Sequence, residues 1–433
     1  MASTVPDAIR TSEKPSKVRY WVIFFAVTLS IITYIDRVAI SLSRGKIAAD
    51  LHLNDVQMGW VFFAFAAAYA AFEIPSGFLG DKLGPRSVLM RIVIWWSFFT
   101  AVTGAAFNLV SLFITQVLFG AGEAGCYPNI TRAFSNWLPQ SERVRSQGIL
   151  WLSARWGGAL TPLLLVFLFR YMTWRQAFPA FGLLGVVWAV AFYFWFRDDP
   201  RDKPGVNQAE LDLLKYNVPA GSHKHVPWKK YFRSKTVWLL CGQYAALSFP
   251  WYFWITWAPT FIDEHHVNAA STFMKVLPLF FGGLGSIVSG LLSGPITRLT
   301  GDIALTRRIL ACTGFVSAAC CLVMGTILRD PYVAVLAVAF SSFCNDLVMP
   351  TAWGTVMDVA GGYSGTLSGA MNMSGNAAGA LFGPIAGWVL TRTHHNWNDV
   401  LFMGAAVYLT GFVMWLMIDP VTPIDRSEMR VHI

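Results

Sequence analysis

The run WVIFFAVTLSIITYIDRVAI, residues 21–40, contains only two charged side chains, Asp36 and Arg37. A helix needs about 20 consecutive, mostly apolar residues to cross the hydrocarbon core of a bilayer. Comparable runs recur along the chain, in which 55% of the residues are hydrophobic, 13% are charged and the mean hydropathy is +0.49. A chain of this composition cannot present only water-facing surface, so the sequence predicts an all-α, polytopic membrane protein.

Twelve apolar segments are long enough to span the membrane. They lie near residues 20–42, 56–79, 87–107, 110–133, 147–170, 174–196, 236–258, 272–297, 307–328, 331–353, 363–390 and 399–419. One long polar segment divides them six and six. We therefore expect the following parts: a cytoplasmic tail (1–19), an amino-terminal six-helix bundle (20–196), a cytoplasmic linker (197–235), a carboxy-terminal six-helix bundle (236–419) and a second cytoplasmic tail (420–433).

The net charge of +9 follows the topology of the chain. With the amino terminus in the cytoplasm, most arginines and lysines fall in cytoplasmic tails, loops and the linker, as the positive-inside rule requires. The predicted partners are therefore the lipid bilayer and a small molecule, and nucleic acid is not expected.

The cysteines and histidines indicate no metal site, no cofactor and no enzyme. The six cysteines lie in predicted helices without metal-ligand spacing, and the eight histidines lie in loops or at the tail. A nucleophile paired with an imidazole base is therefore not expected inside the membrane, which argues against catalysis.

The two halves contain similar segments. The fifth span reads SARWGGALTP from Ser153 and the eleventh reads SGNAAGALFGP from Ser374. In the fourth and tenth spans, Glu123 precedes Pro128 and Asp346 precedes Pro350. Parallel repeats of this kind predict two pseudo-symmetric bundles that hold a substrate between them near the middle of the membrane.

A charged loop, GFLGDKLGPR at 77–86, has a degenerate counterpart, GLLSGPITRLTG, at 290–301. Its pattern resembles the signature loop of the major facilitator superfamily. Further segments resemble the anion:cation symporter branch of that superfamily: YIDR (34–37), YAAFEIPSGFLGD (69–81), GEAGCYPNITRAFSNWLP (122–139), WYFWITWAPTF (251–261) and GAMNMSGNAAGALFGP (369–384). This branch includes bacterial carriers of hexuronates, aldonates and aldarates and animal sialic-acid and vesicular glutamate transporters.

The resemblance implies proton-coupled uptake of a small organic anion, such as a hexuronate, aldonate or aldarate, by a monomer in the bacterial inner membrane with both termini cytoplasmic. The proton is the coupling ion, and no other cofactor is expected. The alternatives are a carrier of another mono- or dicarboxylate, an exporter or antiporter on the same fold, and a membrane sensor that does not transport.

Ionisable residues inside the membrane need a partner or a function, since each costs roughly 2.5 to 3.5 kcal/mol at the centre of a helix on insertion scales. In the resembled family, acids at the positions of Glu123 and Asp36 are protonation sites. Asp346 provides the only central charge of the carboxy-terminal half. It is expected to be a further proton site or an acceptor for substrate hydroxyl groups.

Anion binding is expected to depend on Arg155. Sugar-acid carriers of the resembled family often have an arginine seven residues before the acid of the fourth span, and this chain has Gln116 there. Our hypothesis is that Arg155 binds the substrate carboxylate, while Glu123 pairs with it in the empty state and takes a proton when the anion arrives. The alternative is a permanent structural pair of Arg155 with Glu73 or Glu123.

The other site residues follow from helix faces and from the resemblance. Asp36 and Arg37 are consecutive, so their side chains diverge by about 100° and one of them faces a neighbouring helix. The expected substrate-binding residues besides Arg155 are Arg37, Tyr69, Gln116, Glu73, Asn372, Asn376 and Trp254. Packing between helices or an interfacial aromatic belt is the alternative for the aromatic and amide members. The expected cytoplasmic gate residues are Asp81, Arg86 and Arg132.

Overall fold

The structure is a computed structural model that describes residues 13–215, 217, 227–264 and 271–425. The outer parts of both predicted tails, residues 1–12 and 426–433, lie outside these ranges. Within the described ranges, every regular element is a helix. The predicted all-α fold with twelve long spans is confirmed.

The first half of the chain forms six spans, the fourth of which is interrupted. Its helices are α1 (Arg19–Asp50), α2 (Asp55–Leu83), α3 (Pro85–Thr103), α4 (Leu109–Glu123), α5 (Cys126–Trp137), α6 (Gln140–Leu168) and α7 (Trp174–Trp195). The linker contains η1 (Pro200–Asp202), α8 (Gln208–Leu214) and α9 (Trp228–Arg233).

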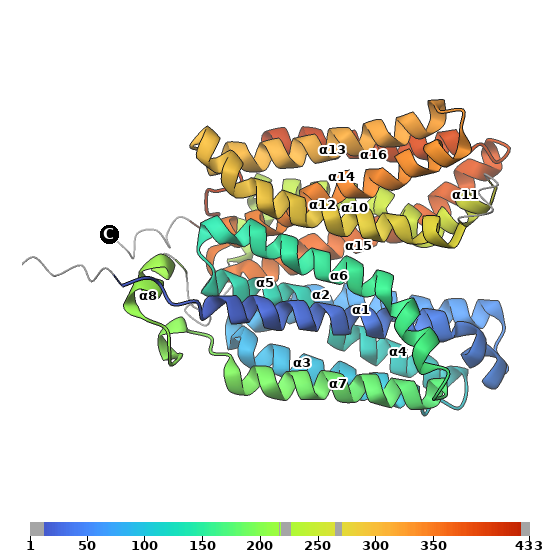
Figure 1. Cartoon of the computed structure of the whole chain (residues 1–433), viewed down its shortest axis with the longest axis horizontal. Coiled ribbons are helices and arrows are strands. Elements are labelled where there is room, and N and C mark those ends of the chain that lie inside the picture. Colours follow the sequence, from blue (N-terminus) through green and yellow to red (C-terminus); the bar gives the residue numbers. More distant parts are fainter. Residues whose placement is uncertain (1–12, 216, 218–226, 265–270, 426–433) are drawn as a thin grey trace, which may run out of the picture.

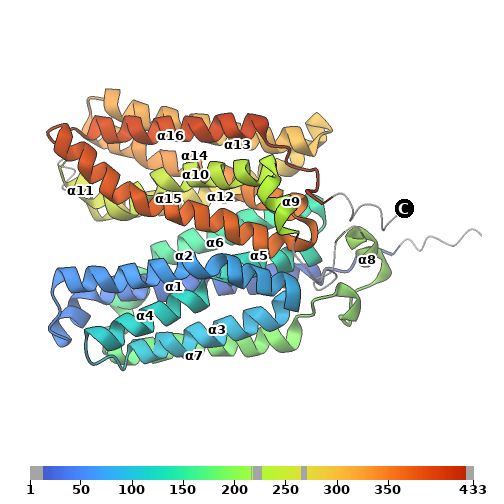
Figure 2. The same ribbon diagram turned by 180° about the vertical axis from the view of Figure 1, so that it is seen from behind.

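The second half forms six more spans. Its helices are α10 (Lys235–Thr256), α11 (Ala258–Glu264), α12 (Ser271–Thr300), α13 (Ile303–Ile327), α14 (Pro331–Val359), η2 (Gly361–Tyr363), α15 (Ser364–Arg392) and α16 (Trp397–Met417). Figures 1 and 2 show α1 to α7 as one bundle and α10 to α16 as another. The linker helix α8 lies at one end of the molecule, and we call that end the tail face (Figure 1).

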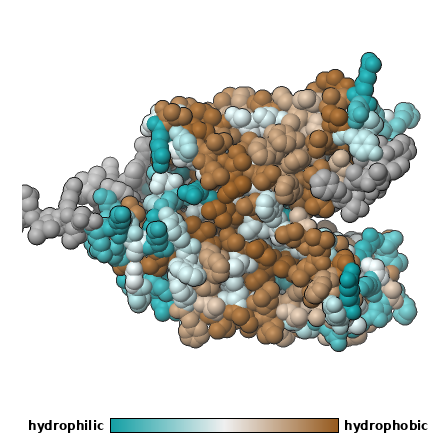
Figure 3. Space-filling view, viewed as in Figure 1, coloured by the Kyte–Doolittle hydropathy of each residue, from teal (hydrophilic) through white to brown (hydrophobic). Residues whose placement is uncertain are grey.

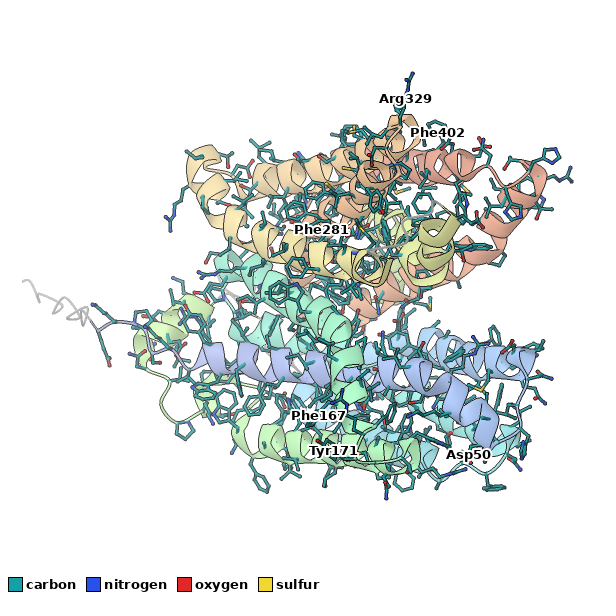
Figure 4. All side chains as sticks on the ribbon, turned by 45° about the vertical axis from the view of Figure 1, so that its right-hand side comes forward. Asp50, Phe167, Tyr171, Phe281, Arg329 and Phe402 are labelled. Atoms are coloured by element: carbon teal, nitrogen blue, oxygen red, sulfur yellow. The ribbon has the colours of Figure 1, made fainter. Side chains whose placement is uncertain are left out.

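The outer surface has the hydrophobicity expected of a protein that faces lipid. Of the described helices, nine are long and apolar enough to cross a membrane, with α4 and α5 counted together as Leu109–Trp137. Hydrophobic side chains cover the middle of the molecule in Figure 3, and hydrophilic ones gather at its two ends. In Figure 4, Phe167 and Phe402 lie along the helices, whereas Asp50 and Arg329 lie at the edges of the molecule. Both phenylalanines are about half exposed in the absence of lipid, at 56% and 48%.

The remaining three spans, α3, α10 and α15, are not among these nine helices. Of the three, α15 contains the serines, glycines and asparagines of the segment SGTLSGAMNMSGNAAGAL and packs against α2 of the other half. A helix buried between two bundles does not need the hydropathy of one that faces lipid.

At the tail face, α6 and α14 extend furthest beyond the predicted apolar segments. The fifth span begins at Gln140 instead of residue 147, and the tenth ends at Val359 instead of residue 353. The added turns contain Arg143 and Asp358, which hydropathy excludes from a span. Both are buried, and they bond to each other across the two halves.

The fourth span is interrupted next to its acid. Helix α4 ends at Glu123, and α5 begins at Cys126. Pro128 has no N–H to donate to the carbonyl four residues earlier, which explains an interruption of the backbone ladder at this point. The break places the carboxylate at the end of a helix and not in the middle of one.

The two halves meet at two equivalent crossings, α2 with α15 and α6 with α12. A β-carbon on Gly77 would lie 2.2 Å from the carbonyl oxygen of Gly365, and one on Gly148 would lie 2.6 Å from the carbonyl oxygen of Ser286. Only glycine permits such close contact between backbones. If the second and fifth spans correspond to the eighth and eleventh, the two crossings are one contact repeated by a two-fold axis.

Candidate substrate-binding site

A cavity of about 110 Å³ lies between the two halves, lined by helices α1, α2, α5 and α6 of the first and α10, α14 and α15 of the second. Two guanidinium groups line it, those of Arg37 and Arg155. Its aromatic lining residues are Tyr34, Tyr69, Tyr127, Trp151, Tyr244, Trp251 and Tyr252. Its amide lining residues are Asn345, Asn372 and Asn376. A chamber with two cations and many neutral hydrogen-bond donors is suited to a small polar anion.

Arg37 carries one of these cations and is held by Glu123. Its Nε donates to Glu123 Oε1 at 2.9 Å, and its guanidinium lies 4.4 Å from the centre of the Tyr69 ring. The side chain of Arg37 is 24% exposed, whereas that of Glu123 is fully buried. The guanidinium therefore faces the cavity and the carboxylate lies behind it.

Arg155 pairs with Asp346, so the predicted pairing with Glu123 is wrong, and so is the alternative with Glu73. Nε and Nη2 of Arg155 donate to the two oxygens of Asp346 at 2.7 and 3.1 Å. Trp251 covers the guanidinium at 3.5 Å from its ring centre. Asp346 of α14 is the partner because both of its oxygens face the guanidinium of Arg155 on α6, as a bidentate pair requires. Glu123 is instead bonded to Arg37.

Glu73 lies at the seam between the halves, bonded to two amides of α15. Asn372 and Asn376 both donate to its Oε1, the latter at 2.8 Å. Both amides line the cavity, and so does Tyr69, whose hydroxyl group accepts from Asn372 at 3.4 Å. Of the predicted binding residues, Arg37, Tyr69, Arg155, Asn372 and Asn376 thus share one chamber, with Glu73 directly behind it.

Asp36 and Gln116 lie outside that chamber. A separate void of about 10 Å³ is lined by both residues together with Thr100, Thr103 and Phe119. Gln116 donates to Thr103 at 3.2 Å, and neither oxygen of Asp36 has a hydrogen-bond partner. Gln116 is therefore not among the lining residues of the central cavity, contrary to the prediction, because it faces α3. Asp36 and Arg37 point to different sites, as expected for consecutive helical residues.

Trp254 is also absent from the cavity lining, contrary to the prediction. It is half-buried and packs against Phe253, while the preceding turn of α10 faces the site. The lining residues of α10 include Tyr244, Leu247, Ser248 and Trp251. Their spacing of three and four residues is a helical face, and it is the signal that could have identified Trp251.

An aromatic cluster closes the cavity toward the tail face. Tyr127 stacks on Trp151 with ring centres 4.7 Å apart, and Trp353 lies 5.4 Å from Trp151. Tyr127 and Trp353 are buried, and the Trp353 indole donates to the hydroxyl of Tyr244 at 3.1 Å. The cluster joins α5 and α6 to α14, so it seals the site only while the halves remain in contact here.

At the tail face, Asp81 joins the two halves. Its carboxylate accepts from the backbone nitrogens of Gly365 at 2.9 Å and Thr366 at 2.6 Å, which are free donors in the first turn of α15. Arg132 lies 3.6 Å from the same carboxylate and donates to the carbonyl oxygen of Gly361 at 3.3 Å. The acid of the signature loop thus caps a helix of the opposite half.

A second tail-face cluster surrounds Asp358, which sequence reasoning missed. Arg143 of α6 and Arg307 of α13 both donate to its carboxylate, and Gln140 donates at 3.1 Å. Arg143 also donates to the side chain of Asn217 in the linker at 2.9 Å. The position of Asp358 at the end of an apolar helix is the only sequence signal for it. The notch in the outline between the halves lies at the opposite end of the molecule (Figure 3).

Arg86 does not join the two halves. Its guanidinium donates to the carbonyl oxygen of Tyr193 at 2.9 Å, and its backbone nitrogen donates to Asp198 at 2.9 Å. Burial raises the pKa of Asp198, although the contacts with Arg86 lower it in part. Arg86 therefore fastens the start of α3 to the end of α7 within one bundle, and the prediction that it belongs to the gate is not supported by this geometry.

The sequence matches the family model of the Major Facilitator Superfamily over residues 26–382. Among relatives, a probable sulfoacetate transporter of Cupriavidus necator is 31% identical, covering 96% of this chain and 97% of the relative. The hexuronate transporter of Bacillus subtilis is 26% identical, covering 94% and 96%. A D-galactonate transporter of Escherichia coli is also 26% identical, covering 94% and 96%.

Among solved structures, the proton:xylose symporter XylE shares the fold, with a TM-score of 0.74 and 11% identity over 95% of this chain and 98% of that one. The family match covers most of the chain, and the fold, the signature loop and the cavity between two bundles agree with it. The chain therefore belongs to the major facilitator superfamily and is a membrane transporter, not an enzyme.

Proposed function

We propose that this chain is a proton-coupled symporter that imports a small organic anion by alternating access. One observation carries the proposal: each of the two cavity guanidinium groups is held by a buried carboxylate, Arg37 by Glu123 and Arg155 by Asp346. An anion that takes a guanidinium leaves that carboxylate buried without a cation. Proton binding removes this cost, so anion and proton bind together.

Glu123 is the proposed proton acceptor of this exchange. It lies behind Arg37 as seen from the cavity, so a substrate reaches the guanidinium without touching the acid. The substrate carboxylate replaces Glu123 on Arg37, and the proton keeps the displaced acid neutral. Asp36, buried in its neighbouring void, is proposed as a second proton site, and Asp346 as a third.

Alternating access is proposed to open the tail face. In the present arrangement the Asp81 cap, the Asp358 cluster and the aromatic cluster hold the tail-face ends of the bundles together. These contacts have to separate for the cavity to reach the tail face. We propose that this face is cytoplasmic and that the membrane is the bacterial inner membrane, because the basic residues of the linker lie at this end.

The lining and the relatives support a sugar acid as the proposed substrate class. Tyrosine hydroxyls and asparagine amides can bond to the hydroxyl groups of a sugar acid, and relatives bear the names hexuronate and D-galactonate transporter. A short sulfonated acid is the second candidate, because the relative named a probable sulfoacetate transporter is 31% identical and the cavity is only about 110 Å³. Drug-sized ligands occupy pockets of roughly 300–1,000 Å³.

The test is a thermal-shift panel on the purified protein with hexuronates, aldonates, aldarates, sulfoacetate and simple mono- and dicarboxylates. The acids that stabilise the protein are then measured in proteoliposomes with and without an inward proton gradient. We expect accumulation of the stabilising anion only with the gradient. Stabilisation without accumulation under any gradient would instead support a sensor, and accumulation driven by sodium alone would overturn proton coupling.

A further inference from the structure

Glu73 is a buried acid whose two oxygens have different environments. The residue has no solvent exposure. Oε1 accepts from the amides of Asn372 and Asn376, whereas Oε2 has no hydrogen-bond partner. A carboxylate shares its charge between both oxygens, and both then need donors. A carboxylic acid has one carbonyl oxygen that accepts hydrogen bonds and one hydroxyl oxygen that needs no donor. Oε2, which receives no hydrogen bond, fits the hydroxyl oxygen.

The hydrogen bonds around the seam fix the direction of the amides. Tyr252 donates its hydroxyl hydrogen to Asn376 Oδ1 across 3.2 Å, which turns the amide nitrogen of Asn376 toward Glu73. The amide nitrogen of Asn372 serves both Glu73 and the hydroxyl of Tyr69. Both asparagines therefore present donors to Oε1, and neither donates to Oε2.

No cation is bonded to the acid in the part of the chain that the structure describes. Among the described residues, no Lys, Arg or His nitrogen lies within 4.0 Å of its carboxylate. The charged and titratable groups near it are Arg37 of α1, Tyr69 of α2, and Tyr244 and Tyr252 of α10. Of these, only Arg37 is cationic, and it is bonded to Glu123. A buried acid without a cation neutralises itself by binding a proton.

The backbone next to Glu73 joins the two halves. A β-carbon on Gly369 of α15 would lie 2.6 Å from the carbonyl oxygen of Glu73, so the helices are in contact at this level. Separation of α2 from α15 would withdraw both asparagines and admit water from the cavity that they line. Water stabilises the ionised form, and the proton then leaves Oε2 for that water.

We propose that Glu73 is a proton-binding site that responds to the contact between the halves: protonated while α2 and α15 are closed, and ionised when they part. The ionised form attracts Arg37 away from Glu123, which links this proton to anion binding. The inference rests on the proposed alternating access but not on the identity of the substrate.

Infrared spectroscopy of the purified full chain in nanodiscs without substrate tests the proposal. The wild type is expected to show, at neutral pH, a C=O stretch of a protonated carboxylic acid that disappears in Glu73→Gln. Glu142→Gln is the matched control, because this acid is bonded to Arg19 at the tail face and should contribute no such band. Any band from another protonated acid, such as Asp36, is common to both proteins and cancels in the difference between their spectra. Absence of a carboxylic-acid band from the wild-type spectrum minus the Glu73→Gln spectrum would overturn the proposal.

Hydrogen exchange of α15 provides a second measurement. Exchange around Asn372 and Asn376 should become faster in the wild type as the pH rises, because ionisation of Glu73 favours separation. Glu73→Gln keeps an acceptor for both amides and cannot ionise. Its exchange rate should therefore follow only the intrinsic pH dependence of amide hydrogen exchange. A purely structural Glu73 would give the same pH dependence in both proteins. Neither measurement contains an anion, so failure of anion uptake overturns only the proposed function.

Discussion

The two guanidinium–carboxylate pairs of the cavity differ in where their partners come from. Arg37 and Glu123 both belong to the first half, on α1 and α4, whereas Arg155 of α6 binds Asp346 of α14 in the second half. In transporters built from two bundles, one bundle rocks against the other around the site. A pair within one bundle can persist through that motion, but a pair between bundles has to break or rearrange. The first pair is therefore suited to exchange with a substrate, and the second to holding the closed arrangement.

The largest effect is expected from Arg37→Gln, which removes the cation of the pair within one bundle. Loss of one partner of a buried, hydrogen-bonded charge pair costs about 2–5 kcal/mol. Anion affinity should fall at least about 30-fold by the thermal-shift assay, with uptake at background. Arg37→Lys keeps the charge and should retain part of the affinity. Affinity within a few-fold of wild type in Arg37→Gln would show that the pair within one bundle is not the anion site.

The next smaller effect on uptake is expected for the pair between bundles, which acts mainly on stability. Arg155→Gln and Asp346→Asn each leave a buried charge without its partner, and each should destabilise the protein by roughly 3–5 kcal/mol. The double variant should recover part of this loss, with an interaction energy of about 0.5–3 kcal/mol by thermal unfolding.

The matched comparison is the double variant Arg37→Gln with Glu123→Gln. This variant should regain part of the lost stability, but its uptake should stay at background. The variant with both Arg155 and Asp346 neutralised should retain measurable uptake, and its tail-face amides should exchange hydrogen faster than those of the wild type. Equal uptake in the two double variants would show that the two pairs do not differ in their roles in anion binding.

A smaller effect is expected from Asp81→Asn, which weakens a helix cap between the halves. Asparagine keeps one acceptor for the helix end but loses the negative charge that faces the start of α15 and Arg132. A charge at a helix terminus contributes roughly 0.3–1 kcal/mol. Exchange of the first turn of α15 should become faster, and uptake should fall several-fold. Asp302→Asn is the control, because Asp302 caps α13 within one half through Ala304 at 2.7 Å. If both variants slow uptake equally, the cap between the halves has no special role.

The smallest effect is expected from Arg86→Gln. Arg86 joins α3 to α7 inside one bundle, so its loss leaves every contact between the halves in place. Uptake in proteoliposomes should stay within about two-fold of wild type, since partly exposed polar contacts contribute roughly 1 kcal/mol or less. A loss of uptake as large as that in Asp81→Asn would show that Arg86 takes part in the gate.

Sequence reasoning reached the spans but not the pairings. The resemblance of the signature loop predicted that Asp81 belongs to the gate, and Asp81 caps α15 of the other half. The choice of partner for Arg155 was wrong, because Asp346 lies 191 residues away in the sequence and is one of four buried acids of the membrane interior, with Asp36, Glu73 and Glu123. Gln116 was placed in the site from its position in the family pattern, yet α4 turns it toward Thr103.

The sequence by itself determined the twelve spans, because the bilayer acts on each segment separately through its length and composition. Only the tertiary structure decided which charges meet. Pairing depends on the rotation and depth of each helix, and these are set by contacts between helices, such as Gly77 against Gly365. No local pattern records the rotation of two distant helices relative to each other, so the partners of Arg37, Arg155 and Glu73 emerged only from their packing.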